Sequence, residues 1–329
     1  MLTPKIQSLL IATSLAVLLF ACKKSTTETG STPSDADLQT QSDDESRVSN
    51  ETDAAFDDVN TVMTSQATIT GSENTPIRYG VITTGANQDT VNSLICDAVV
   101  TVDTVDNPRT LTITYNGSNC QLTRSRTGTI VVSIAKGVKW TNAGAVVTVK
   151  FNNLKITRAF DSKSITLNGT HTYTDVSGGS LLSLIANNSA PIVHTITSTD
   201  MSITFDNGTQ RTWNLARQRS YSYDKGIVMT TTGTHADGST TGISEWGLNR
   251  FGNAFTVQIK TGLTIAQSCS WRLTAGEAAL INAQGTTDIR FGLDASGQAT
   301  GCPLGAAAYY FQLSWTGKSG KTYTITMPY

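Results

Sequence analysis

Residues 145–151 read AVVTVKF, in which large apolar residues alternate with polar ones from Val147 to Phe151. Successive side chains of a β-strand point to opposite faces, so this alternation predicts a strand with one buried and one solvated face. Residues 201–205, MSITF, repeat the pattern with Ile203 and Phe205 on the apolar side. Half-buried strands of this kind are typical of antiparallel sheets.

Outward from these two segments, similar runs fill the chain from about Thr75 to Tyr329. Turn sequences such as Asp206-Asn207-Gly208 separate many of them. The predicted strands are 98–104, 110–115, 128–135, 145–151, 154–160, 164–174, 192–197, 201–205, 210–223, 227–234, 242–248, 254–260, 270–274, 287–291, 308–315 and 321–327. Short connections between roughly fifteen strands predict an all-β fold, a large antiparallel meander forming a sandwich or a curled open sheet. An outer-membrane barrel is less favoured because aromatic girdles across the strand ends are missing.

The composition argues against several classes of function. The chain has 329 residues, with 24 Lys and Arg against 25 Asp and Glu, a formal net charge of −1. This balance lacks the basic surface expected of a nucleic-acid-binding protein. Three histidines are too few for a histidine-rich metal site.

The first part of the chain is acidic and the remainder mildly basic. Residues 23–62 carry ten acids and three bases, whereas the chain from Met63 onward carries 15 acids and 20 bases. Residues 22–41 are poor in large apolar side chains, which predicts a disordered tether. Residues 42–64 predict an amphipathic helix, with Ser42 as the N-cap and Glu45 completing a capping box. Its apolar stripe consists of Val48, Phe56, Val59, Val62 and Met63. The alternative is a partly helical end of the tether, and the remaining residues, 65–329, form the predicted β domain.

The N-terminus has the pattern of an export signal. Lys5 precedes a 12-residue apolar run, residues 9–20, which is too short to span a bilayer that requires about 20 residues. The following Leu19-Phe20-Ala21-Cys22 resembles the lipobox of bacterial lipoproteins. That resemblance implies removal of residues 1–21 and acylation of Cys22, which would anchor the protein in a membrane. An ordinary secretory signal cleaved elsewhere is the alternative.

The residue after Cys22 bears on the membrane to which the lipoprotein would be sorted. Lys23 replaces the Asp known as the inner-membrane retention signal, so the resemblance implies an outer-membrane lipoprotein. Whether it faces the periplasm or the cell surface stays open.

The other four cysteines indicate two disulfides in an oxidising compartment. Cys96 and Cys120 bracket one predicted hairpin, and Cys269 and Cys302 bracket a second segment with the same outline. We therefore predict the pairs Cys96–Cys120 and Cys269–Cys302. Zinc sites usually use closely spaced cysteine pairs, which these four do not form.

Known catalytic motifs are missing, and we predict no catalytic residues, no metal site and no cofactor. One cluster is unusual. At period two along residues 210–223, one face of the strand carries Arg211, Trp213, Arg217, Arg219 and Tyr221. Guanidinium and aromatic groups in one stripe could bind a glycan or a lipid headgroup. The alternatives are a solvated strand face with cation–π pairs and, if the stripe is buried, arginines that require carboxylate partners.

The lipobox with the following CKKS, the acidic helix and the cysteine-bracketed hairpins together resemble Bacteroidetes lipoproteins of unknown function. The order Trp213, then Arg217-Gln218-Arg219, then Tyr223-Asp224-Lys225-Gly226 adds to the resemblance. It implies no activity and therefore transfers no site residue.

Two classes of function follow from the sequence. The first is a non-catalytic envelope lipoprotein with a structural or binding role, its partners being the membrane and a glycan or another envelope component. The second is a carrier, or an enzyme, whose curled sheet encloses a ligand such as a lipid or another hydrophobic molecule. A large dry concavity would favour the carrier, and a filled core would favour the first class.

Overall fold

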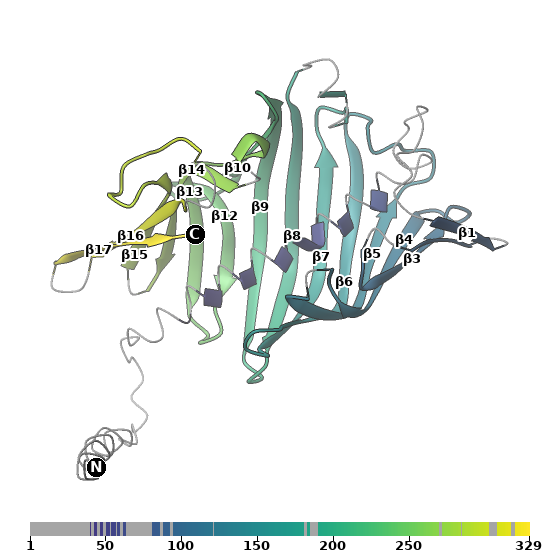
Figure 1. The fold of residues 1–329 in the computed structure, drawn as a ribbon, viewed down its shortest axis with the longest axis horizontal. Coiled ribbons are helices and arrows are strands. Elements are labelled where there is room, and N and C mark those ends of the chain that lie inside the picture. The colour runs from purple at the N-terminus through teal and green to yellow at the C-terminus, as the bar shows by residue number, and fades with distance from the viewer. Residues whose placement is uncertain are drawn as a thin grey trace, which may run out of the picture.

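The structure is a computed structural model. It describes residues 40, 43–44, 47–48, 51–52, 54–56, 58–59, 62–63, 81–85, 88–92, 95–120, 122–180, 183–184, 190–269, 272–283, 285–302, 308–316 and 320–329. The predicted signal peptide, Cys22 and nearly all of the predicted tether lie outside these residues. The prediction of an all-β fold is confirmed, since 17 strands form one antiparallel sheet (Figure 1).

The first nine strands form an antiparallel meander in which each strand pairs with the next. They are β1 (Val81–Gly85), β2 (Gln88–Asn92), β3 (Ala98–Asp103), β4 (Arg109–Ser118), β5 (Arg124–Ile134), β6 (Ala145–Arg158), β7 (Ser164–Asp175), β8 (Ile192–Phe205) and β9 (Gln210–Tyr223).

The meander is interrupted after β9. The next strands are β10 (Ile227–Gly233), β11 (His235–Asp237), β12 (Thr240–Leu248) and β13 (Ala254–Ala266). β9 pairs with β10 along residues 217–223 and with β12 along residues 212–215. β13 likewise pairs with both. β10 and β12 therefore lie end to end and share one position in the sheet.

Beyond β13 the meander resumes toward the C-terminus. A short 3-10 turn, η1 (Gln267–Cys269), leads to β14 (Arg272–Asn282), β15 (Gly285–Leu293), β16 (Tyr310–Thr316) and β17 (Thr322–Pro328). Each of these strands pairs with the next. Among the described residues, β1 and β17 do not pair with each other, so the sheet is open.

Two long strands run through positions that the sequence predicts as breaks. β6 joins the predicted strands 145–151 and 154–160, and β8 joins 192–197 and 201–205. The register shifts at each break, between Phe151 and Leu154 and between Ser198 and Met201. These interruptions are β-bulges, which leave extra residues unpaired and bend the strand.

The bulges form a row across four neighbouring strands. Gly128, Asn153, Gly169 and Asp200, on β5 to β8, all have positive φ, of 105°, 48°, 126° and 61°. Gly, Asn and Asp are the residues that adopt this region most readily. At Gly169 a Cβ atom would lie 2.5 Å from the sulfur of Met201, so glycine is also required there by the close approach of β8. Aligned bulges curve the sheet at this level.

A helical segment covers the hollow of this sheet. The described residues between 40 and 63 are helical, and in Figure 1 they run as purple pieces from beside β12 to beside β5. The helix is predicted to start at 42, but Thr40 is already helical. The predicted capping pair, Ser42 and Glu45, lies outside the described residues.

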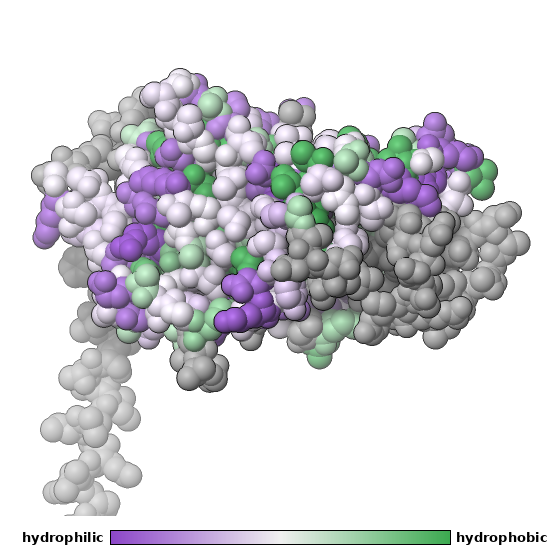
Figure 2. All heavy atoms as spheres, turned by 90° about the horizontal axis from the view of Figure 1, so that it is seen from above, coloured by the Kyte–Doolittle hydropathy of each residue, from purple (hydrophilic) through white to green (hydrophobic). Residues whose placement is uncertain are grey.

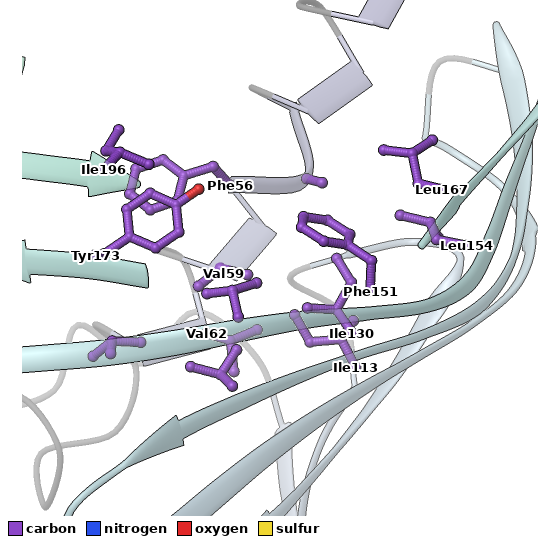
Figure 3. Close-up of a cluster of buried hydrophobic side chains, with 14 of the residues drawn as sticks. Phe56, Val59, Val62, Ile113, Ile130, Phe151, Leu154, Leu167, Tyr173 and Ile196 are labelled. Carbon is purple, nitrogen blue, oxygen red and sulfur yellow. The ribbon is translucent and has the colours of Figure 1, made fainter. Parts of the chain in front are cut away.

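The predicted apolar stripe of the helix is buried against the strands. Val59 and Val62 are 0% exposed, and the ring of Phe56 stacks on that of Tyr173 with centroids 4.1 Å apart. Figure 3 shows these helix side chains facing apolar residues of several strands, including Ile113 and Phe151. Complete burial of such a side chain contributes about 1.5–3 kcal/mol. The helix is therefore a layer of the core, and we call the face of the sheet that it covers the inner face.

Of the two predicted architectures, the structure shows the curled open sheet. One helix and one sheet enclose the core, in place of two stacked sheets. The surface seen from above is largely neutral and hydrophilic, with hydrophobic residues in scattered groups (Figure 2). This agrees with the alternation of threonine and apolar residues along the strands.

Candidate functional site

The predicted arginine and tryptophan stripe lies on β9, and all five side chains share one face as expected. That face is the inner one. Exposed fractions are 2% for Arg211, 2% for Trp213, 9% for Arg217, 5% for Arg219 and 7% for Tyr221. The stripe is therefore packed inside the molecule and offers no open surface to a glycan. The structure instead agrees with the alternative in which the stripe is buried and its arginines have carboxylate partners.

The carboxylate partner is Glu245 on β12. Arg211 donates a hydrogen bond to its Oε2 at 2.9 Å, and Arg217 donates to its Oε1. Glu245 is itself 2% exposed and sits opposite Leu215, between the two arginines in the register of β9 and β12. Burying a charge is costly unless it is paired, so the three groups depend on one another.

Aromatic rings complete the surroundings of the arginines. The guanidinium of Arg211 lies 4.2 Å from the ring centroid of Phe255 and 5.4 Å from that of Trp213. Arg219 lies 5.5 Å from the ring of Phe56, which belongs to the helical segment. The sequence predicted cation–π contacts on an exposed strand face, but these contacts lie in the interior of the protein, between β9 and its neighbours.

Acidic residues of the helical segment pair with arginines of the sheet. Glu51 lies 2.7 Å from Arg124, and a second ion pair joins Asp44 to Arg250 beside the β12–β13 turn. The acidic leader and the basic body of the sequence therefore meet at the inner face.

One further acid of the helix enters a network. Asp58 lies 2.6 Å from Arg126 and accepts a hydrogen bond from the Tyr115 hydroxyl at 2.8 Å. Arg126 also forms a bidentate pair with Asp97, with both contacts at 2.7 Å. Bidentate charge-assisted bonds fix geometry as well as adding energy, so this network sets the position of the helix along β4 and β5.

A buried titratable pair lies on the adjoining strands. Asp175 of β7 is 0% exposed and His194 of β8 is 7% exposed, with His194 Nε2 3.8 Å from Asp175 Oδ1. Burial raises the pKa of Asp175 to about 6, partly offset by hydrogen bonds from Gly178 and Ser177. Burial, with the nearby charge of Arg219, lowers the pKa of His194 to about 4. Both groups are therefore neutral at about pH 5.

The described residues leave a small cavity between the helical segment and the sheet. This cavity of about 10 Å³ lies beside Arg217, Arg219 and Thr52, which is about the size of one water molecule. A second depression, of about 340 Å³ and open to the surface, lies near Asp97 and Thr114. Among the described residues, neither feature is a large enclosed apolar cavity.

The four paired cysteines lie where the hairpin outline predicts. Cys96 is bonded to Cys120 and Cys269 to Cys302, with Cα–Cα distances of 5.2 and 5.3 Å. Cys22, the predicted lipidation site, lies outside the described residues. Within the described ranges, no three His, Cys, Asp or Glu side chains are grouped as metal ligands. The described helical residues include no stretch long and apolar enough to cross a bilayer.

Sequence reasoning missed the role of Glu245 and the individual helix–sheet ion pairs. Glu245 stands out as one of few glutamates near a strand. β10 and β11 separate its strand, β12, from β9 in the sequence, so no local pattern joins Glu245 to the stripe. Comparison with protein-family models, curated proteins and solved structures found no match.

Proposed function

We propose that this protein is a lipid-anchored lipoprotein of the bacterial cell envelope, with a non-catalytic structural or binding role. Acylated Cys22 would hold it in the outer membrane, and the predicted tether would lead from the anchor to the helical segment.

The observation that carries the proposal is the docking of the helical segment. The segment directly after the predicted tether is tied to the sheet by apolar burial and by ion pairs distributed along its length, from Asp44 to Asp58. A membrane anchor at Cys22 would therefore be joined to the rigid domain itself. This arrangement suits a protein whose β domain must be kept at a membrane.

The filled inner face supports the structural role over the carrier role. A half-barrel carrier holds its ligand in the hollow of the sheet, and ligand pockets are typically about 300–1,000 Å³. Here the helix occupies the hollow, and the cavity beside Arg217 has a volume of about 10 Å³. Carriage of a lipid in that hollow would require the helix to leave.

The test uses the full chain expressed in a bacterium with labelled palmitate. We expect label in the wild-type protein, recovery in the outer-membrane fraction, and loss of both in Cys22→Ala. As a matched control, Lys23→Asp should keep the label but move the protein to the inner-membrane fraction. Label that persists in Cys22→Ala, or wild-type protein without label, would refute the lipid anchor.

A further inference from the structure

The last four strands carry an apolar face that continues the inner face of the sheet. Leu280 of β14 packs against the core, and Ala278 on the same strand is directly opposite Ile289 of β15. Ile289 is in turn opposite Leu313 of β16, which is opposite Ile325 of β17. Directly paired residues of a sheet share a face. The same side of the sheet therefore remains apolar to its C-terminal edge.

We call this region the lobe face. It is the part of this side formed by Ile289, Leu313, Trp315, Tyr323, Ile325 and Met327, whereas Phe311, opposite Met327, packs with Tyr329. The opposite side of the same strands is polar, with hydroxyl pairs such as Ser314–Thr324, at 3.0 Å, and Thr316–Thr322, at 3.1 Å. These strands thus have the alternating pattern of an antiparallel sheet that is packed on one face and solvated on the other.

No described element covers the lobe face. Tyr323 is 41% exposed, Ile325 44% and Met327 36%, whereas inner-face residues under the helix, such as Ile113, are 0% exposed. The described helical residues begin at Thr40, one turn before Asp44, which pairs with Arg250 beside the β12–β13 turn. Exposed apolar faces of this kind usually mark an interaction site.

The two long stretches that flank the described helical residues have little with which to cover this face. Residues 23–39, the stretch that leads into the helix, contain only Ala36 and Leu38 as apolar residues. Residues 64–80 lead into β1, at the far edge of the sheet from β17. These two stretches therefore offer little apolar surface to the lobe face, and the occupant that we infer comes from outside the chain.

We infer that the lobe face rests on the phospholipid bilayer in which Cys22 is anchored; this inference rests on the lipid anchor proposed above. The helix lies on the inner face, and Asp44, one turn after its first described residue, pairs with Arg250 beside the β12–β13 turn. The 18 residues from Cys22 to Thr40 span at most about 60 Å when extended. As a flexible coil they span about 23 Å. An anchor within that reach of Asp44 places the bilayer close enough to meet the side on which the lobe face is uncovered.

The side chains of the lobe face suit a membrane interface. Trp and Tyr are enriched at the level of the lipid headgroups, because each has an apolar ring with a polar group. Trp315 and Tyr323 stack with ring centroids 5.4 Å apart, and the Lys321 ammonium lies 5.3 Å from the Tyr323 ring. A cation at the rim of an aromatic patch can reach the phosphate groups of the lipids.

The test measures the emission of Trp315 at a membrane. Full-length protein is reconstituted into phosphatylethanolamine–phosphatidylglycerol vesicles, with or without brominated acyl chains that quench tryptophan on contact. The Trp315 signal is the difference between the wild type and Trp315→Phe. We expect bromolipid to remove at least half of that signal.

Two variants of β17 provide the controls. Tyr323→Ser/Ile325→Ser/Met327→Ser should abolish the quenching, whereas Thr322→Ser/Thr324→Ser/Thr326→Ser, on the opposite side of the same strand, should leave it unchanged. A Trp315 signal insensitive to bromolipid in palmitoylated, vesicle-bound protein would overturn the inference and leave the anchor intact. A detergent-soluble dimer that only the first variant dissociates, without quenching, would assign the face to a second copy. If palmitate is not incorporated, the proposed lipid anchor is refuted. In that case the unacylated protein is added to the same vesicles, and membrane contact by the lobe face is also refuted unless bromolipid quenches Trp315.

Discussion

A single carboxylate, Glu245, balances two buried arginines of β9. Arg211 and Arg217 are 2% and 9% exposed, and each contacts a different oxygen of the same side chain. A buried ion pair is weak evidence of net stabilisation, but loss of one partner leaves the others buried and unpaired. Replacing Glu245 should therefore destabilise the fold by more than the intact ion pairs stabilise it.

We predict that Glu245→Gln lowers the free energy of unfolding by about 3–5 kcal/mol. The exposed ion pair of Lys260 with Asp288, at 2.5 Å, is the matched control, and Lys260→Gln should cost less than about 1 kcal/mol. Urea denaturation of both variants checks the difference. Equal, small shifts in the two midpoints would show that the arginines find other partners.

The stripe that contains Arg217 and Arg219 can also be tested directly. Because both side chains are buried, Arg217→Gln/Arg219→Gln should lower the denaturation midpoint clearly. An open, solvated stripe would instead leave stability within about 0.5 kcal/mol of the wild type. A glycan array with the wild-type protein completes the test, since salt-sensitive binding that the double variant loses without destabilisation would restore the surface-binding interpretation.

Asp175 and His194 give opposite pH dependence to stability. The pKa of Asp175 is raised from 3.8 to about 6, so its stabilising contribution is complete below pH 3.8 and is lost as the pH rises toward 6. The pKa of His194 is lowered from 6.5 to about 4, so its contribution is complete above pH 6.5 and is lost as the pH falls toward 4. In the wild type the two effects oppose each other between pH 4 and 6.

Single variants should separate them. Relative to the wild type, Asp175→Asn should gain stability as the pH is raised from 4 to 6, and His194→Gln should gain stability as the pH is lowered from 6.5 to 4. Urea midpoints at four pH values across this range give the two slopes. Slopes of the same sign would mean that the two side chains do not titrate as their burial requires.

At the level of elements, the row of bulges on β5 to β8 gives the sheet its bend. Gly169 tests it, because a Cβ there would lie 2.5 Å from the sulfur and 2.9 Å from the Cα of Met201. Gly208, in the β8–β9 turn, also has a positive φ, of 81°, but faces open space. Gly208→Ala should therefore cost only the conformational strain, about 1–2 kcal/mol. Gly169→Ala should cost clearly more in thermal or urea denaturation, and equal costs would mean that β8 can move away.

The strands were the most predictable elements. Alternation along residues 210–223 gives β9 with the correct ends, because a half-buried strand imposes period two on its own sequence. The same alternation is lost at Asn152 and Asn153, where a bulge resembles a turn, so one strand was predicted as two. Local sequence cannot distinguish a chain that reverses from one that bulges, since that choice is made by pairing with β5 and β7.

Pairing across the sheet was not predictable from the sequence. β12 pairs with the part of β9 that β10 leaves unpaired, which places Glu245 beside arginines about 30 positions earlier. The acidic leader and basic body were visible as a charge asymmetry, yet the specific pairs depend on how the sheet curls around the helix. For the same reason the sequence identified the stripe of β9 but not the side of the sheet to which it belongs.

For the molecule as a whole, the two disulfides close loops of similar length, with sequence separations of 24 and 33. The chain-entropy model assigns about 3–4 kcal/mol to either loop. We therefore predict similar losses of stability in Cys96→Ala/Cys120→Ala and in Cys269→Ala/Cys302→Ala, measured by guanidinium denaturation without reductant. Peptide mapping of the untreated protein should recover both native pairs, and free thiols or a crossed pairing would contradict the structure.

Because the helical segment comes early in the chain, it is synthesised well before the last strands that it packs against. Asp44 and its partner Arg250 are separated by 206 residues. At about 5–20 residues per second, the helix is synthesised about 10–40 s before that arginine. During this interval the apolar stripe of Phe56 and Val59 has no completed sheet to bury it. A nascent chain of this protein is therefore a natural client for chaperones that hold polypeptides open until their last segments arrive.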